Sequence, residues 1–308
     1  MQALKLDALA GWRWVAGGWR IFRKQPLAFA SLLFFYALLL FGASPLIESF
    51  ARGVGSVLPP LLADLVALVG GLVVAVVTPA LSVGFQQACR LSGSGLPIHP
   101  ILLFAPFRSG RPTLRRLLVL GVIQAVALVV IVFITIGPSA FRSDPPPVDG
   151  KPAASAPAAP VPGAAPGEGG LTAEQQDAIR KQTLALFKQA LTFVPVAAIM
   201  WYAPMLVAWH GLPPGKAIFF SVVAVWRNRS AFAVYIAGWL SVWMGLSIAF
   251  SIVLGLFTLI GIGSLAAIVA IPLLLSMVTC MYCSVYPTYA TVFVDPQAPA
   301  APVVPPPS

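Results

Sequence analysis

Apolar residues along the chain fall into six long runs separated by polar or charged residues. The runs cover residues 27–47, 61–83, 117–136, 191–209, 231–257 and 262–286. A helix needs about 20 predominantly apolar residues to cross the hydrocarbon core of a bilayer, and each run is about that long. Buried helices of a soluble protein would carry a polar face to cover the surface, and these runs have none. The pattern therefore predicts an all-α membrane protein with about six transmembrane helices.

Lysine and arginine are distributed unevenly between the segments that connect the runs. Thirteen of them lie before the first run, between the second and third, and between the fourth and fifth. The alternate short connections, 48–60 and 258–261, hold only Arg52. Because basic residues are retained on the cytoplasmic side, these three basic segments and both termini are expected to be cytoplasmic. The six helices then form three hairpins, with interfacial helices on the cytoplasmic side.

The overall charge could suggest a nucleic-acid partner, but the positions of the basic residues argue against one. The net charge is +10, although only 9% of the 308 residues are charged, and the mean hydropathy is +0.91. The basic residues lie at the ends of the apolar runs instead of forming a separate basic domain. We therefore expect the lipid bilayer, and not a nucleic acid, to be the partner of these charges.

Composition divides the chain into five regions. Residues 1–26 are expected to form a cytoplasmic amphipathic segment, 27–137 to hold transmembrane helices 1–3, 138–190 to form a periplasmic Pro/Ala/Gly-rich loop with a short helix, 191–291 to hold helices 4–6, and 292–308 to form a disordered cytoplasmic tail. Residues 144–170 are almost wholly Pro, Ala and Gly, which cannot bury enough apolar surface to order a loop. The first run exceeds the 7 to 15 residues of a signal-peptide core, so it should remain as an anchor.

A similar motif precedes each odd-numbered run. The motifs are FRKQP at 22–26, FRSGRP at 107–112 and WRNRS at 226–230. One explanation is a threefold internal repeat, in which each unit is an approach segment followed by a helical hairpin. The other is that every inner membrane boundary uses the same Arg and aromatic anchors, without any repeat.

The first approach segment has the clearest amphipathic pattern. Six apolar residues share one face of a helix, namely Leu4, Ala8, Trp12, Val15, Trp19 and Phe22. Arg13, Arg20 and Lys24 lie on the opposite face, so the segment should lie in the interface and direct these three side chains to anionic lipid headgroups. Its glycines are expected to weaken the helix. The alternative is an ordinary juxtamembrane anchor.

Side chains that could form a catalytic or metal site are scarce. His99 and His210 lie beside Pro-rich turns without a carboxylate or Cys nearby, so both are expected on the surface. Cys280 and Cys283 have the C-x-x-C spacing of redox and zinc sites, but they lie inside a run that offers no further ligands, so we expect core residues. Asp64 is peripheral in the second run, where water can reach it. These observations predict no enzyme activity, no cofactor and no metal.

Small residues recur every four positions in two of the runs. They are Ala67, Gly71 and Ala75 in the second run and Ser247, Ser251 and Gly255 in the fifth. Small side chains at this spacing let helix backbones approach closely. They predict helix-packing faces, either inside one chain or between copies of it.

The motifs GWRW at 11–14 and FRKQP at 22–26 resemble the start of a family of uncharacterised bacterial inner-membrane proteins. Members of that family have a Trp-rich amphipathic N-terminus, about six spans and a variable outer loop. The resemblance implies the bacterial inner membrane and, because the family has no assigned activity, it implies no catalytic residue. We expect a non-enzymatic protein that contacts lipid or acts as a scaffold for itself or for other membrane proteins. The alternative is a small transporter or channel for an apolar or amphiphilic solute.

The charge distribution predicts the topology directly. Reporter fusions at positions within 48–60 and 138–190 should report a periplasmic location, and fusions within 108–116 a cytoplasmic one, because basic segments resist translocation. A fusion near Arg111 that is active only in the periplasm would contradict this topology.

Overall fold

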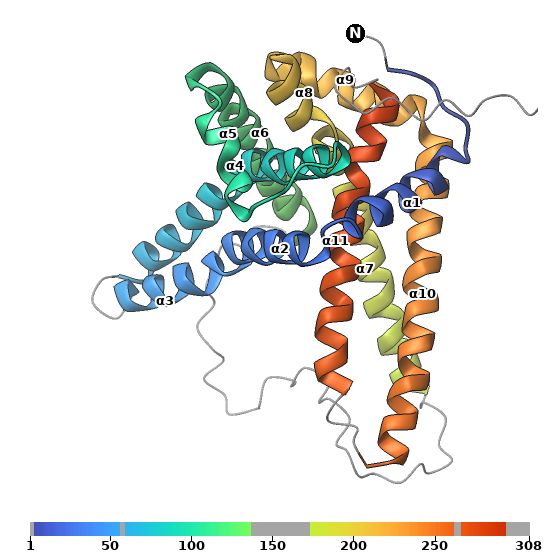
Figure 1. The fold of residues 1–308 in the computed structure, drawn as a ribbon. Helices are drawn as coiled ribbons and strands as arrows, with labels where there is room; N and C mark the ends of the chain where they lie inside the picture. Colours follow the sequence, from blue (N-terminus) through green and yellow to red (C-terminus); the bar gives the residue numbers. More distant parts are fainter. Residues whose placement is uncertain (1–2, 56–58, 137–172, 262–265, 294–308) are drawn as a thin grey trace, which may run out of the picture. The chain divides into compact units, whose positions relative to one another are not determined.

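The computed structural model describes residues 3–55, 59–136, 173–261 and 266–293, which are mostly helical (Figure 1). The loop at 144–170 and the tail at 294–308, both predicted to be disordered, lie outside the described residues. The chain divides into two compact units. Met1–Ala125 and Ala198–Ser308 form the larger unit, and Val126–Ala197 forms the smaller one. The described residues of the smaller unit are helical residues of the third and fourth spans, and the larger unit holds the candidate sites discussed below.

Six helical stretches among the described residues are long and apolar enough to cross a membrane. They are Pro26–Phe50, Leu61–Gly93, Arg111–Ile131, Thr192–His210, Arg229–Leu259 and Val269–Val292. Each overlaps one of the apolar runs in the sequence, so the predicted all-α membrane fold is confirmed.

Two of these spans are each built from two helices. The first span is formed by α2 (Pro26–Phe41) and α3 (Ala43–Gly55). The fourth is formed by α7 (Ala173–Met200) and α8 (Ala203–His210). The sequence predicts a single helix in both places. Pro204 lies in the first turn of α8, where a missing N–H is tolerated, and this explains why the second break falls there.

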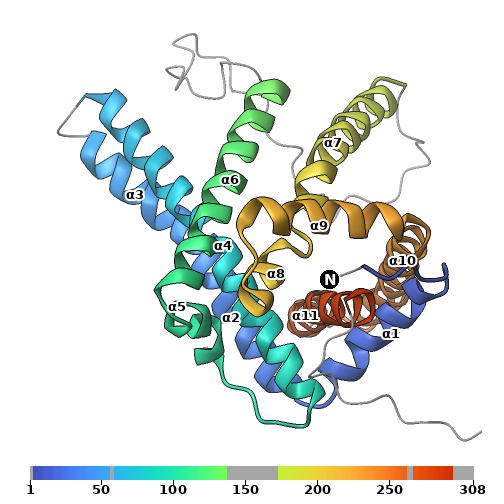
Figure 2. The ribbon, with the colours of Figure 1, turned by 90° about the horizontal axis from the view of Figure 1, so that it is seen from above.

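The other four spans are continuous, and three approach segments precede the odd-numbered ones. The continuous helices are α4 (Pro60–Gly93), α6 (Arg111–Ile136), α10 (Arg229–Leu259) and α11 (Ala266–Val292). The approach segments are α1 (Ala10–Phe22), the short 3-10 helix η1 (Pro100–Phe104) with α5 (Ala105–Arg108), and α9 (Pro214–Arg227). In Figure 2, α11 is seen almost end-on, whereas α1 and α9 run across the view. These two approach helices therefore lie across the direction of the span.

The same neighbours recur around the larger unit. The last helix of each hairpin packs on the approach segment of the next: α4 contacts η1 and α5, α8 contacts α9, and α11 contacts α1. In two of these three cases the first helix of the preceding hairpin also contacts the approach segment: α2 contacts η1, and α10 contacts α1. Shared boundary anchors alone would not produce the same packing three times around a closed cycle. The contacts therefore favour a true internal repeat.

Glycines bring several of these elements into backbone contact. A Cβ added to Gly18 of α1 would lie 2.6 Å from the Cys280 carbonyl oxygen of α11. A Cβ on Gly11 would overlap the backbone of α10, one on Gly84 the backbone of η1, and one on Gly121 the backbone of α4. Substitution at these positions would require backbone movement. The glycines that the sequence analysis regarded as weakening α1 are therefore the residues that allow it to pack.

The small residues predicted to form packing faces are exposed or partly buried among the described residues. A Cβ on Gly71 or Gly255 would meet no atom within 4 Å. Ser247 and Ser251 are exposed, and Ser251 donates its hydroxyl hydrogen to the Ser247 carbonyl of the same helix. Ala67 and Ala75 are only partly buried. Among the described residues other glycines make the closest backbone contacts; a packing role for these six residues, within one chain or between copies of it, stays a prediction.

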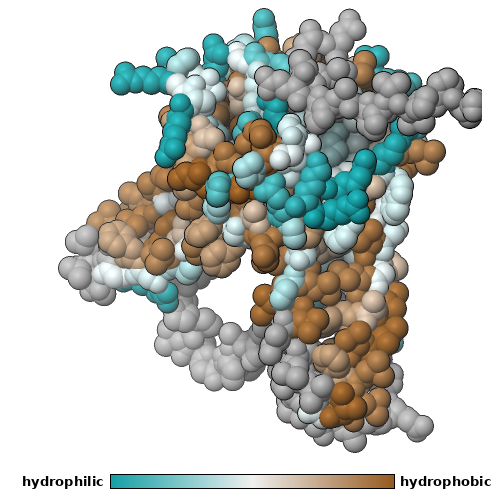
Figure 3. Space-filling model, in the orientation of Figure 1, coloured by the Kyte–Doolittle hydropathy of each residue, from teal (hydrophilic) through white to brown (hydrophobic). Residues whose placement is uncertain are grey.

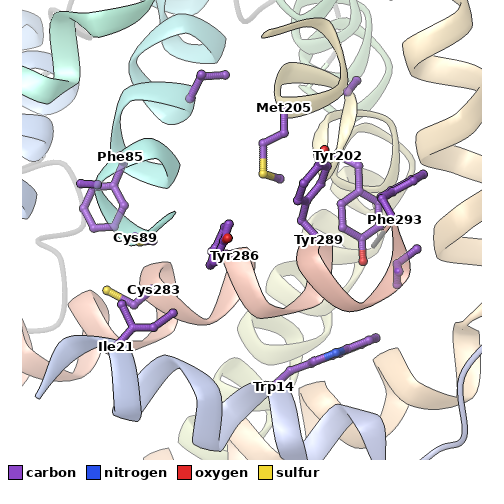
Figure 4. Packing of buried hydrophobic residues seen from close by; sticks show 14 of the residues in the cluster. Trp14, Ile21, Phe85, Cys89, Tyr202, Met205, Cys283, Tyr286, Tyr289 and Phe293 are labelled. Carbon is purple, nitrogen blue, oxygen red and sulfur yellow. The ribbon is translucent and has the colours of Figure 1, made fainter. Parts of the chain in front are cut away.

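The buried core of the larger unit is rich in aromatic side chains. Trp14, Tyr202, Tyr289, Phe29 and Phe85 are among its largest fully buried residues. In the same order, they come from α1, the residue before α8, α11, α2 and α4. Figure 4 shows several of them converging on α11. On the face seen in Figure 3, hydrophilic side chains gather in the upper part of the view, where α1 lies. Apolar side chains cover the lower part of α10. The core thus forms where the approach segments meet the spans.

Substituting glycines tests this packing. Gly18→Leu should lower the free energy of unfolding by about 3 kcal/mol, because the new side chain collides with the α11 backbone. Gly255→Leu adds the same side chain where nothing lies nearby, and should leave the unfolding transition of detergent-solubilised monomer unchanged. Equal destabilisation of the two variants would contradict the close approach of α1 and α11.

Candidate functional site

The N-terminal helix α1 is anchored in the core by Trp14. This side chain is 1% exposed, and its indole N–H donates to the Thr291 hydroxyl at 2.8 Å. Its ring lies 5.3 Å from the Phe232 ring and 6.0 Å from the Tyr235 ring, measured between centroids. Aromatic burial with a satisfied indole N–H contributes both area and orientation. The helix is therefore held against α10 and α11 in one fixed rotation.

The face of α1 that its apolar pattern predicts to lie among the lipid headgroups is only partly exposed. Val15 and Phe22 of the predicted apolar face are buried, but Trp12 and Trp19 are 52% and 55% exposed. The buried face is instead centred on Trp14 and on glycines, which have no side chain to register in a hydrophobic pattern. The prediction of an apolar face among the lipid headgroups is therefore wrong for Val15 and Phe22, whereas Trp12 and Trp19 stay exposed; contact with helix backbone favours glycine on the buried face.

The three basic residues predicted to contact anionic lipid occupy different environments. Arg13 is exposed and forms an ion pair with Asp7 at 2.5 Å. Lys24 donates to the carbonyls of Ser92 and Gly93, at 3.1 and 3.0 Å, and so caps the end of α4. Arg20 is exposed, one residue after Trp19. Arg20 has the environment expected of a lipid contact, whereas Lys24 also has a structural role that the sequence did not indicate.

A buried asparagine holds the extended segment that leads into α1. Asn228, between α9 and α10, is 0% exposed. Its amide group donates to the Leu4 carbonyl at 2.9 Å, and its side-chain oxygen accepts from the Leu6 N–H at 2.8 Å. The Leu4 N–H in turn donates to the Val292 carbonyl of α11. The backbone of residues 4–6 is therefore fastened at both ends, as buried backbone groups outside helices require.

The same arrangement recurs at the next approach segment. Gln25, between α1 and α2, donates to the Leu96 carbonyl at 2.8 Å and accepts from the Ile98 N–H at 3.1 Å. As with Asn228, one amide binds the carbonyl of one residue and the N–H of the residue two positions later. Both amides occupy the polar positions of the motifs at 22–26 and 226–230. We call these two interactions the amide clasps.

The segment that leads into α9, the third approach segment, is held by a side chain that only donates hydrogen bonds. The Arg116 guanidinium donates to the carbonyl of Gly211, the residue that ends α8 in a left-handed conformation at φ 62°. Two positions later the chain has Pro213, which has no N–H to donate. The guanidinium, which only donates, therefore pairs the one carbonyl of this segment, and no side-chain acceptor is required for an N–H.

Polar groups between α4, α8 and α11 are hydrogen-bonded to one another. His210 is partly buried against Tyr289 and hydrogen-bonds with its hydroxyl, which corrects the prediction of a surface histidine. Trp209 donates to the Gln87 side-chain oxygen at 3.0 Å, and the Arg90 guanidinium lies 4.9 Å from its ring centroid. His99, by contrast, is exposed as predicted. The pairing orients aromatic rings where the three helices meet.

All three cysteines of the chain are buried free thiols. Cys89 of α4 and Cys283 of α11 are neighbours where these two helices meet (Figure 4). The sequence analysis paired Cys280 with Cys283 on one helix face and did not connect Cys89 with them, because nothing in the sequence shows which face of α4 meets α11. Among the residues that the structure describes, no group of three His, Cys, Asp or Glu side chains is placed to hold a metal ion.

Comparison with known proteins agrees with the membrane fold. The chain is 31% identical, over 318 aligned residues, to a protein of Burkholderia thailandensis described as a probable inner membrane protein, and the alignment covers 99% of this chain and 98% of the relative. The chain belongs to this inner-membrane protein family. The resemblance seen in the N-terminal motifs is thereby confirmed, and the location in the inner membrane follows. No family profile matches the chain. No solved structure matches it.

The amide clasp at Asn228 can be tested by truncation. Asn228→Ala leaves a partly buried carbonyl and a partly buried N–H without their partner, so the free energy of unfolding should fall by about 3 kcal/mol. Ser94→Ala, at an exposed site, serves as the control and should change it by less than about 0.5 kcal/mol. Chemical unfolding in detergent micelles measures both values, and similar stabilities for the two variants would argue against the clasp.

Proposed function

We propose that this inner-membrane protein is non-enzymatic and binds anionic lipid at the cytoplasmic surface, where it acts as a scaffold or as a partner of other membrane components. The observation that carries the proposal is the exposed face of α1. It presents Trp12 and Trp19, each more than half exposed, with Arg13 and Arg20 directly after them. The two Trp-Arg pairs are separated by seven residues and so lie on the same side of the helix.

The chemistry of these side chains suits a membrane interface. Tryptophan prefers the headgroup region, where its ring is buried and its N–H stays near water. Arginine binds phosphate oxygens through a planar set of donors. Because α1 is already held by Trp14 and by its glycine contacts, these four side chains would need little ordering to bind lipid. The positions of the basic segments support a cytoplasmic location for this surface.

Contact with lipid headgroups predicts a measurable lipid selectivity. In membranes of mixed composition, spin-labelled phosphatidylglycerol should be enriched around the protein over phosphatidylcholine, and salt should reduce the enrichment. Arg20→Gln should weaken the preference by up to about fivefold, since one basic residue near an anionic surface contributes roughly 1 kcal/mol.

The control for this experiment is Arg52→Gln. Arg52 is exposed, hydrogen-bonds within its own helix α3, and lies in a segment expected on the opposite side of the membrane. It should leave the selectivity unchanged. Wild-type protein without any anionic preference, or an Arg20 variant that keeps the full preference, would overturn the proposal. Solute movement by the reconstituted protein would favour the transporter alternative.

A further inference from the structure

The second basic surface of the larger unit lies at the junction of α9 and α10. A hollow of about 450 Å³ there is lined by Lys5, Val222, Val223, Trp226, Arg227 and Arg229. The three basic side chains come from the N-terminal segment, the end of α9 and the start of α10. From this geometry we infer a binding site for one anionic phospholipid, with its phosphate among the three cations. The inference rests on the proposed lipid-contact function and assigns it a second, separate site.

The charges at this site have no ion-pair partner among the described residues. No carboxylate among the described residues forms an ion pair with Lys5, Arg227 or Arg229. The Arg229 guanidinium lies 5.7 Å from the Trp226 ring centroid, a cation–π distance that leaves its N–H groups available to an anion. Three cations around one hollow favour a ligand with a phosphate group. Basic pockets beside transmembrane helices on the cytoplasmic side are typical sites for anionic headgroups.

The amide clasp at Asn228 positions the cations. Asn228 is the residue between Arg227 and Arg229, and its amide binds the backbone on both sides of Lys5. The Lys5 backbone is therefore fixed beside the two arginines before any ligand arrives. A site whose groups are already held in place loses less entropy on binding. At the equivalent position of the clasp at Gln25, the middle residue is Pro97, so the charged site is specific to this one approach segment.

The surface of α9 next to the cations is apolar and exposed. Phe219, Val222, Val223 and Trp226 are 63%, 40%, 37% and 71% exposed. Their spacing of three and four residues places them along one stripe of the helix. This apolar stripe adjoins the basic hollow, so an acyl chain lying along the stripe would place its headgroup among the three cations. Free phosphate would use the cations alone, so the adjoining stripe favours a lipid as the source of the phosphate.

Lipid titration of the purified full-length protein tests the site. In neutral detergent, phosphatidylglycerol should raise the thermal unfolding midpoint in a saturable way with one lipid per chain, counted by native mass spectrometry, and phosphatidylcholine should not. The double variant Arg227→Gln/Arg229→Gln should bind phosphatidylglycerol roughly 30-fold more weakly, from about 1 kcal/mol for each lost cation. The variant Arg227→Lys/Arg229→Lys should retain most of the binding because it keeps both charges.

The matched control is Arg108→Gln/Arg111→Gln. It removes two exposed arginines from another basic segment and should alter binding less than about twofold if the site is specific. An equal loss in the control, or no loss in the Arg227/Arg229 variant, would overturn the site. Inorganic phosphate that raises the midpoint as far as phosphatidylglycerol does would overturn lipid as the ligand. If Arg20→Gln loses the lipid selectivity while the Arg227→Gln/Arg229→Gln variant binds phosphatidylglycerol normally, this site alone is overturned. If Arg20→Gln keeps the selectivity while the Arg227→Gln/Arg229→Gln variant binds more weakly, the α1 proposal alone is overturned.

Discussion

The backbone of the three approach segments must find hydrogen-bond partners, and the rest of the larger unit is arranged around that requirement. An extended segment has no internal hydrogen bonds, and its groups are costly to bury unpaired. Asn228 and Gln25 provide both a donor and an acceptor to residues 4–6 and 96–98. Arg116 provides only a donor to Gly211, where Pro213 leaves only a carbonyl to satisfy. The chemistry of each fastening side chain therefore matches the backbone groups that it meets.

The fastened segments link the hairpins in a cycle. A residue beside an odd-numbered span, or in its first turns in the case of Arg116, binds the segment that leads into another hairpin. The last helix of the preceding hairpin packs on that same approach segment. The final connection, from Asn228 to residues 4–6, joins parts of the chain that are 222 residues or more apart. Such a closure gives the N-terminal segment a defined position even though it precedes the first span. It also explains why α1 is the best-packed of the approach helices.

Lipid contact is compatible with this architecture because binding groups and packing groups occupy different faces. On α1 the packed face is made of Trp14 and glycines, and the exposed face carries the Trp-Arg pairs. On α9 the buried residues are small, namely Ala217, Ser221 and Ala224, while the large apolar side chains are exposed. α9 thus directs its large side chains outward, and α1, although it buries Trp14, exposes Trp12 and Trp19. For a helix in a soluble protein this would expose apolar surface to water, whereas at a membrane interface the lipid covers it.

The number of spans, the all-α fold and the three amphipathic approach segments could be predicted from the sequence. These features depend on hydrophobicity summed over about 20 residues, which is independent of the neighbours that the helix acquires. The N-terminal motifs likewise identified the family. The amide clasps were visible only as polar residues in a repeated motif, because their partners lie 71 to 224 residues away along the chain.

Tertiary structure alone decided which face of each helix is buried. Hydrophobic periodicity predicted one apolar face of α1 among the lipid headgroups, but Val15 and Phe22 of that face are buried against protein, because in a membrane protein both the lipid-facing and the protein-facing sides can be apolar. Glycine carries no hydrophobic signal, so the sequence could not distinguish Gly18, where an added Cβ would overlap α11, from Gly255, where it would meet no described atom within 4 Å. The sequence also could not show that Cys89 lies beside Cys283, because these residues come from different helices. The same holds for Lys5, which lines one hollow with Arg227 and Arg229. The sequence by itself determined which segments enter the membrane, because burial in lipid depends on composition; the fold decided which residues meet, because that depends on close contact between distant backbones.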